Sequence, residues 1–112
     1  MLSRTAIRPY QTMYLLDQGV LPVSIDYRFC PEISILNGAV LDCVDALHWI
    51  QKSLPNMAKR KDFIVDVNKI VAIGYSTGGH LAMMLCTEAP KVGITPPNAV
   101  LGFYPPANCE CD

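Results

Sequence analysis

The residues best suited to chemistry are gathered around Ser76, in the run Gly74-Tyr75-Ser76-Thr77-Gly78, which Gly79 follows. A serine hydroxyl becomes a useful nucleophile when a base accepts its proton, and the acyl-transfer intermediate then carries an oxyanion that needs hydrogen-bond donors. Ser76 supplies the hydroxyl, and the backbone N–H of Thr77 supplies one donor. The pattern therefore indicates acyl transfer through an acyl-serine intermediate.

The G-x-S-x-G spacing is weak evidence by itself, because roughly one unrelated chain of this length in thirty has it by chance. Its flanks are more informative. Residues 69–74 contain a β-branched apolar run, typical of a strand buried on both faces of a parallel sheet, and residues 81–89 are apolar at helical spacing. The chain must reverse tightly between them, and Gly74 and Gly78 lack the side chains that would obstruct such a turn. We predict a nucleophile elbow with Thr77 at the helix N-terminus; the competing interpretation is an ordinary turn serine.

A base for Ser76 is harder to find. His80 lies four residues later, and helical side chains lean toward the N-terminus, so contact with Ser76 is conceivable. A structural histidine is the favoured interpretation, because a base normally approaches the serine from another loop. His48 is a weaker candidate still. Asp42 and Asp45 are interpreted as a solvated helix edge and not as a pair of carboxylates for acid–base work.

Composition narrows the class of protein. The chain has 112 residues, 51% of them hydrophobic, and a formal net charge of −1, which suits one globular unit or part of one. Lys59 to Lys61 form the only basic cluster, so nucleic acid is not an expected partner. No apolar run has the length of a membrane span or resembles a signal peptide. We expect a soluble, cytoplasmic protein without a cofactor and without membrane contact.

The chain has five cysteines, an odd number, and their spacing is not that of a disulfide framework. Cys43 and Cys86 are interpreted as small apolar residues on the core faces of helices. Cys109 and Cys111 could suggest a metal site, but no second pair or nearby histidine supports it, and no metal is expected.

The rest of the chain predicts the elements that hold the serine. Helices are expected over residues 1–19, 39–54 and from the turn to residue 89. Strands are expected over residues 20–27, 69–74 and 99–104. Loops are expected over residues 28–38, 56–68 and 89–98. Strands that alternate with helices favour right-handed crossovers and a parallel sheet, so the predicted fold class is α/β with three αβα layers, about three strands and about three helices.

At this level of detail the chain resembles the α/β-hydrolases, and within them the hormone-sensitive-lipase-like esterases. The residues that carry the likeness are Ser24 to Glu32 (S-I-D-Y-R-F-C-P-E), Asp42, Ala46, Trp49, Ile50, Gly74 to Ala82 and Phe103 to Pro105. Leu21 to Arg28 and Ser76 to His80 are further similar to the esterase-type releasing domain at the C-terminal end of some fungal non-reducing polyketide synthases. The likeness extends over essentially the whole chain.

The resemblance implies a serine hydrolase that acts on a small-molecule carboxylic ester or acyl thioester. Ser76 would be the nucleophile, the Thr77 N–H an oxyanion donor, and Gly74, Gly78 and Gly79 the elbow glycines. Asp26, Arg28 and Glu32 match a segment that braces loops through hydrogen bonds and ion pairs. Residues 1–112 would form the central part of a single α/β-hydrolase domain.

Two parts of the family pattern have no match. The His-Gly-Gly-Gly oxyanion loop would precede residue 1, and the acid and base of the triad would follow Asp112. We therefore expect the nucleophile-bearing middle of a serine esterase or thioesterase, weakly active or inactive as this chain. The alternative is a catalytically inactive fragment or an interaction module.

The same comparison predicts association. In the family's sheet, one strand lies between the strands that match residues 20–27 and 69–74. Without it, these strands would expose unpaired edges or pair in another order. We expect the chain to be poorly soluble or to associate through exposed sheet edges.

Overall fold

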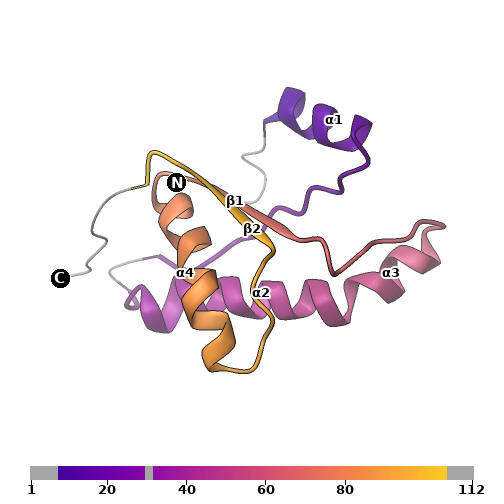
Figure 1. The fold of residues 1–112 in the computed structure, drawn as a ribbon. Helices are drawn as coiled ribbons and strands as arrows, with labels where there is room; N and C mark the ends of the chain where they lie inside the picture. Colours follow the sequence, from indigo (N-terminus) through magenta and orange to yellow (C-terminus); the bar gives the residue numbers. More distant parts are fainter. Residues whose placement is uncertain (1–7, 30–31, 106–112) are drawn as a thin grey trace.

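The computed structural model describes residues 8–29 and 32–105, and the elements follow one another as shown in Figure 1. Their bounds are Pro9–Asp17 (α1), Leu36–Val40 (η1, a short π-helix), Leu41–Lys52 (α2), Leu54–Arg60 (α3), Val71–Tyr75 (β1), Thr77–Lys91 (α4) and Ala99–Phe103 (β2). The start of the first expected helix, at residues 1–7, and the pair Cys109 and Cys111 lie outside the described residues.

The sheet of the described part has two parallel strands, β1 and β2, with α4 as the connection between them. Val71 is paired with Ala99, and the register continues to Tyr75 with Phe103. Asn98 begins the ladder, because its side-chain Oδ1 accepts from the Ile70 N–H and its own N–H donates to the Ile70 carbonyl, both at 2.8 Å. The α/β class and the parallel pairing expected from the sequence are confirmed.

The core lies between α2 and α4. Val40, Val44 and Leu47 meet Leu81 and Leu85 there, all less than a tenth exposed. The helical spacing of the apolar residues therefore predicted the buried face of each helix. Figure 1 shows α4 lying across α2 on one side of the strands.

Of the two described cysteines, only one is in the core. Cys43 is buried, and burial raises the pKa of its thiol to about 12, so it remains a protonated, apolar side chain. Cys86, also expected on a core face, is exposed. This expectation was wrong because α2 packs against the side of α4 that carries Leu81 and Leu85, and Cys86 lies outside that contact.

One face of the sheet is covered and the other is largely bare. On the covered face, the glycines allow α4 to approach closely, since a Cβ added to Gly102 would lie 3.6 Å from the Gly79 carbonyl oxygen. On the opposite face, Val71, Ile73 and Leu101 are 55%, 39% and 48% exposed. We call these three residues the bare sheet face. The expectation of a strand buried on both faces was wrong for the described part, because α2 and α4 both lie on the same side.

Residues 20–27 form no strand in the structure, contrary to expectation. A strand needs a hydrogen-bonded neighbour, and the only ladder among the described residues joins β1 to β2. The segment nevertheless contributes to the core, since Ile25 and Tyr27 pack against it.

The expected loop at residues 56–68 is partly helical. The helix expected over residues 39–54 is followed directly by Pro55, which stands in the first turn of α3, where proline is well tolerated. Leu54 and Ala58 are the buried residues of this short helix. Within residues 8–29 and 32–105, every helix is too short or too polar to span a lipid bilayer.

Candidate active site

Ser76 occupies a single-residue turn between the last residue of β1 and the first residue of α4. Its backbone has φ 53° and ψ −124°, a conformation that residues with a side chain seldom adopt. Hydrogen bonds hold it on both sides. The Ser76 N–H donates to the Phe103 carbonyl oxygen at 2.9 Å, and the Ser76 carbonyl oxygen accepts from the Gly79 N–H at 2.9 Å. The neighbouring structure therefore imposes the strained conformation.

The glycines around the turn have different roles. A Cβ on Gly74 would overlap the backbone carbonyl of Gly78, so only glycine fits at that position. A Cβ on Gly79 would lie 3.1 Å from the Gly74 carbonyl oxygen and 3.3 Å from Pro105 Cβ, which is a tight fit. A Cβ on Gly78 would meet only the Tyr27 hydroxyl, at an ordinary 3.8 Å. The close approach of α4 to β1 thus depends mainly on Gly74 and Gly79.

Ser76 and Thr77 are both exposed to solvent. Thr77 is the first residue of α4, so its N–H has no partner within the helix, and the helix dipole is positive at this end. A hydroxyl and an available amide therefore lie side by side at the carboxyl end of a parallel strand. This arrangement can present a nucleophile and an oxyanion donor to the same carbonyl group.

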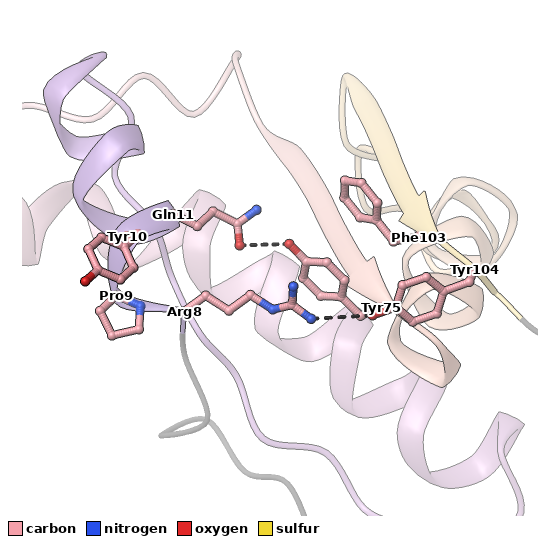
Figure 2. A pocket seen from close by; sticks show the side chains of 7 residues that line it. All are labelled: Arg8, Pro9, Tyr10, Gln11, Tyr75, Phe103 and Tyr104. Carbon is pink, nitrogen blue, oxygen red and sulfur yellow. Dashed lines mark hydrogen bonds between the residues drawn. The ribbon is translucent and has the colours of Figure 1, made fainter.

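Tyr75 connects the turn to the segment that begins α1 (Figure 2). Arg8 lies over the Tyr75 ring, with Cζ 4.1 Å from the ring centroid. The Tyr75 hydroxyl donates a hydrogen bond to Gln11 Oε1 at 2.8 Å. Phe103 stacks on the ring at 4.9 Å with the planes 14° apart, and Tyr104 approaches at 6.3 Å. We call these five residues the Tyr75 cluster.

An open pocket of about 650 Å³ lies within the Tyr75 cluster, and Pro9 and Tyr10 complete its lining. Ser76 and Thr77 do not line it, so the pocket is beside the serine turn and not around it. Sequence reasoning missed Arg8, Gln11 and Tyr104. Only Tyr104 carried a signal, because it is the last residue of an expected strand, at the same edge of the sheet as Ser76.

The other sequence candidates are spread over the fold. His80 is half-buried in the first turns of α4, with its backbone N–H 3.3 Å from the Ser76 carbonyl oxygen, whereas His48 is exposed on α2. Glu32 is exposed, and Asp26 takes part in an interaction of its own. Only His80 therefore shares the neighbourhood of the serine turn.

Asp42 is not the solvated residue that the sequence suggested. Arg28 donates to its carboxylate from Nε and a terminal nitrogen at 2.9 to 3.2 Å, and the Arg28 backbone N–H adds a bond of 2.8 Å. The hydrogen bonds from Arg28 lower the pKa of Asp42 below its ordinary value. The loop after residue 27 is thereby attached to the start of α2, which agrees with the bracing role expected of Arg28.

Comparison with known proteins identifies the family. The profile of the α/β-hydrolase fold family matches residues 13–112. The chain belongs to the α/β-hydrolase family. Its relatives include much longer fungal proteins: it is 59% identical to the non-reducing polyketide synthase mapC of Penicillium brevicompactum, over 98% of the chain and 4% of that protein.

Two further relatives are also non-reducing polyketide synthases. The chain is 51% identical to the non-reducing polyketide synthase atr1 of Stereocaulon alpinum, over 99% of the chain and 4% of the relative. It is 50% identical to the non-reducing polyketide synthase ascC of Acremonium egyptiacum, over 97% of the chain and 5% of the relative. The chain thus spans about one twentieth of the length of these relatives. No solved protein structure matches it.

Proposed function

We propose that this α/β-hydrolase chain carries the nucleophile of a serine hydrolase for carboxylic esters or acyl thioesters. The observation that carries the proposal is the backbone of Ser76, held at φ 53° between a parallel strand and a helix, with the side chain exposed. Strain at a residue with a side chain persists where the surroundings enforce it, and such sites are often functional. In this proposal, Gly74, Gly78 and Gly79 are the elbow glycines.

The reaction proceeds through an acyl-serine. Ser76 Oγ attacks the substrate carbonyl carbon while a base takes its proton, and the oxyanion that forms accepts a hydrogen bond from the Thr77 N–H. The bond from carbon to the leaving oxygen or sulfur then breaks, and the leaving group takes the proton. Water attacks the acyl-Ser76 ester in the same way, which releases the acid and restores the hydroxyl.

The general base and its acidic partner are supplied, in this proposal, from outside the chain. His48 is exposed on α2, and no hydrogen bond or ion pair of the described residues joins it to the turn. His80 belongs to the same helix as Thr77, whereas a base must reach the serine hydroxyl from a direction that leaves the attacking oxygen free. The positions of both histidines therefore favour a structural role.

The relatives support the proposed substrate class. They are polyketide synthases by name, and a polyketide acyl chain joined through a thioester is a substrate that an acyl-serine mechanism would cleave. We propose a small-molecule ester or acyl thioester, with water or another nucleophile as acceptor. No cofactor takes part in the proposed reaction.

A second candidate function is an interaction module without catalysis. The bare sheet face favours it, because parallel strands are ordinarily covered on both sides. The two candidates differ in the reactivity of Ser76.

A fluorophosphonate probe separates the two. The probe labels only serines that are activated for attack, so it is applied to the protein together with the segment that supplies the general base. The hydrolase proposal then predicts labelling of the folded protein, loss of label in Ser76→Ala and full labelling in the control Ser53→Ala, which removes an exposed serine at the end of α2. Folded protein that takes up no label would favour the interaction module. Equal labelling of Ser76→Ala would contradict the choice of Ser76.

A further inference from the structure

The Tyr75 cluster connects the N-terminal segment to the serine turn, over 64 residues of sequence between Gln11 and Tyr75. We propose that Arg8 and Gln11 are positioning residues for Ser76, which they hold in place through the ring of Tyr75. The inference rests on the proposed function only in its consequence for reactivity. Its structural content concerns the order of the turn and can be measured separately.

Helix α1 is attached to the rest of the fold by side chains at its N-terminal end. The helix buries no residue of its own. Arg8, at its N-terminal boundary, covers one side of the Tyr75 ring, and Gln11 accepts the hydrogen bond of the Tyr75 hydroxyl in a half-buried position. Figure 2 shows both side chains extending from α1 toward Tyr75. Side-chain contacts to Tyr75, and not a buried helix face, therefore join α1 to the sheet.

Phe103 connects Tyr75 to the backbone of Ser76. Phe103 takes part in two contacts at once: its ring stacks on Tyr75, and its carbonyl oxygen accepts the Ser76 N–H. Tyr75 and Phe103 are also direct partners in the sheet register. If the Tyr75 ring moved, Phe103 would lose its stacking partner. The hydrogen bond from the Ser76 N–H to the Phe103 carbonyl oxygen would then be disturbed as well.

The residues that follow the two strands have strained backbones. Ser76 has φ 53° and Tyr104 has φ 40°, and each stands one residue beyond the paired residues Tyr75 and Phe103. Arg8 donates to the Tyr104 hydroxyl at 3.4 Å, and it lies over the ring of Tyr75, the residue that precedes the Ser76 turn. Two strained turns at the ends of neighbouring strands need external contacts to remain ordered. Arg8 provides such a contact to Tyr104 directly and to Ser76 through Tyr75.

Amide hydrogen exchange by NMR tests the proposal on the whole protein without requiring activity. The readout is the exchange rate of the Ser76 N–H, with the Leu47 N–H in the middle of α2 as an internal reference for global unfolding. In Arg8→Ala, exchange at Ser76 is expected to rise about threefold, the size of an exposed cation–π contact. In Gln11→Ala it is expected to rise about fivefold, the size of one net hydrogen bond. Exchange at Leu47 stays constant in both.

Conservative and remote variants serve as controls. Arg8→Lys keeps a cation over the ring and Gln11→Glu keeps an acceptor for the Tyr75 hydroxyl, so both are expected to restore slow exchange at Ser76. Arg60→Ala removes an exposed arginine at the end of α3 and leaves exchange at Ser76 unchanged. Unchanged exchange at Ser76 in both Arg8→Ala and Gln11→Ala would overturn the proposal, and so would an equal rise at Leu47.

Tyr75→Phe decides the matter if the alanine variants do not fold. It removes one oxygen atom and keeps the ring, the stacking and the contact with Arg8, so only the Gln11 bond is lost. Faster exchange at Ser76 supports the proposal, and an unchanged rate refutes it. Fluorophosphonate labelling then separates the two claims: wild-type protein that stays unlabelled in the presence of the segment that supplies the base contradicts the proposed function, whereas the exchange rates judge the role of Arg8 and Gln11.

Discussion

The backbone N–H of Ser76 donates a 2.9 Å hydrogen bond to the carbonyl oxygen of Phe103, at the end of the neighbouring strand. This bond extends the pairing of β1 with β2 by one residue into the turn, so the position of Ser76 depends on both strands. The reactive region is therefore a property of the sheet edge, and changes at either strand end are expected to affect it.

Gly74 and Gly102 are partners in the sheet, and they should respond differently to alanine. Gly74→Ala places a methyl group into the Gly78 backbone carbonyl, so we expect it to lower the free energy of unfolding by about 3 kcal/mol and to distort the turn. Gly102→Ala meets its nearest atom at 3.6 Å and should change stability by less than about 1 kcal/mol. Urea denaturation measures both. Similar losses in the two variants would disprove the steric role given to Gly74.

Glycine at position 76 should relieve the backbone strain. Glycine adopts positive φ readily whereas alanine does not, so Ser76→Gly should be more stable than Ser76→Ala by about 1 kcal/mol, although glycine loses more entropy on folding. Both variants lack the hydroxyl and should lack fluorophosphonate labelling. The comparison is made by urea denaturation under identical conditions. An alanine variant as stable as the glycine variant would mean that the turn is not strained.

The ion pair between Arg28 and Asp42 should make stability depend on pH. The hydrogen bonds from Arg28 lower the pKa of Asp42 in the folded state, so its stabilising contribution is complete above the unfolded-state pKa, near about 4, and is lost as the pH falls through the folded value. Asp42→Asn should therefore be less stable than wild type at neutral pH, and the difference should shrink in acid. Thermal unfolding across pH measures it. A constant stability difference between Asp42→Asn and wild type across this pH range would refute the assignment.

The bare sheet face should promote self-association of the isolated chain. Val71, Ile73 and Leu101 present an apolar surface, and burying it against a second copy removes that surface from water. We expect sedimentation velocity to show species larger than a monomer that diminish in Ile73→Thr/Leu101→Thr. The control Ile64→Thr changes a residue that is 95% exposed but lies outside the sheet, and it should leave association unchanged. A strictly monomeric wild-type chain would contradict this prediction.

The strand, turn and helix around Ser76 could be predicted because their signals are local. A β-branched run, glycines around one serine and apolar residues at helical spacing stand consecutively in the sequence, and each restricts the backbone within a few residues. The α2 face through Val44 and Leu47 was predictable for the same reason.

The structural features that the sequence did not predict depend on contacts between distant segments of the chain. Residues 20–27 have strand-like composition, but a strand also needs a neighbour to pair with. Val71 and Ile73 have the composition of buried residues, but burial requires another segment to cover them. The contact between Gln11 and Tyr75 joins residues 64 positions apart, and no local pattern marks either as the partner of the other.

Detection of the acyl-enzyme tests the central claim most directly. The protein, together with the segment that supplies the general base, is incubated with a simple acyl thioester, quenched in acid and digested, and the peptide that contains Ser76 is sequenced by tandem mass spectrometry. We predict a mass increase equal to the acyl group on Ser76 itself, absent from Ser76→Ala and present in Ser53→Ala. An adduct confined to another residue, or folded protein without any acyl adduct, would contradict the assignment of Ser76 as the nucleophile.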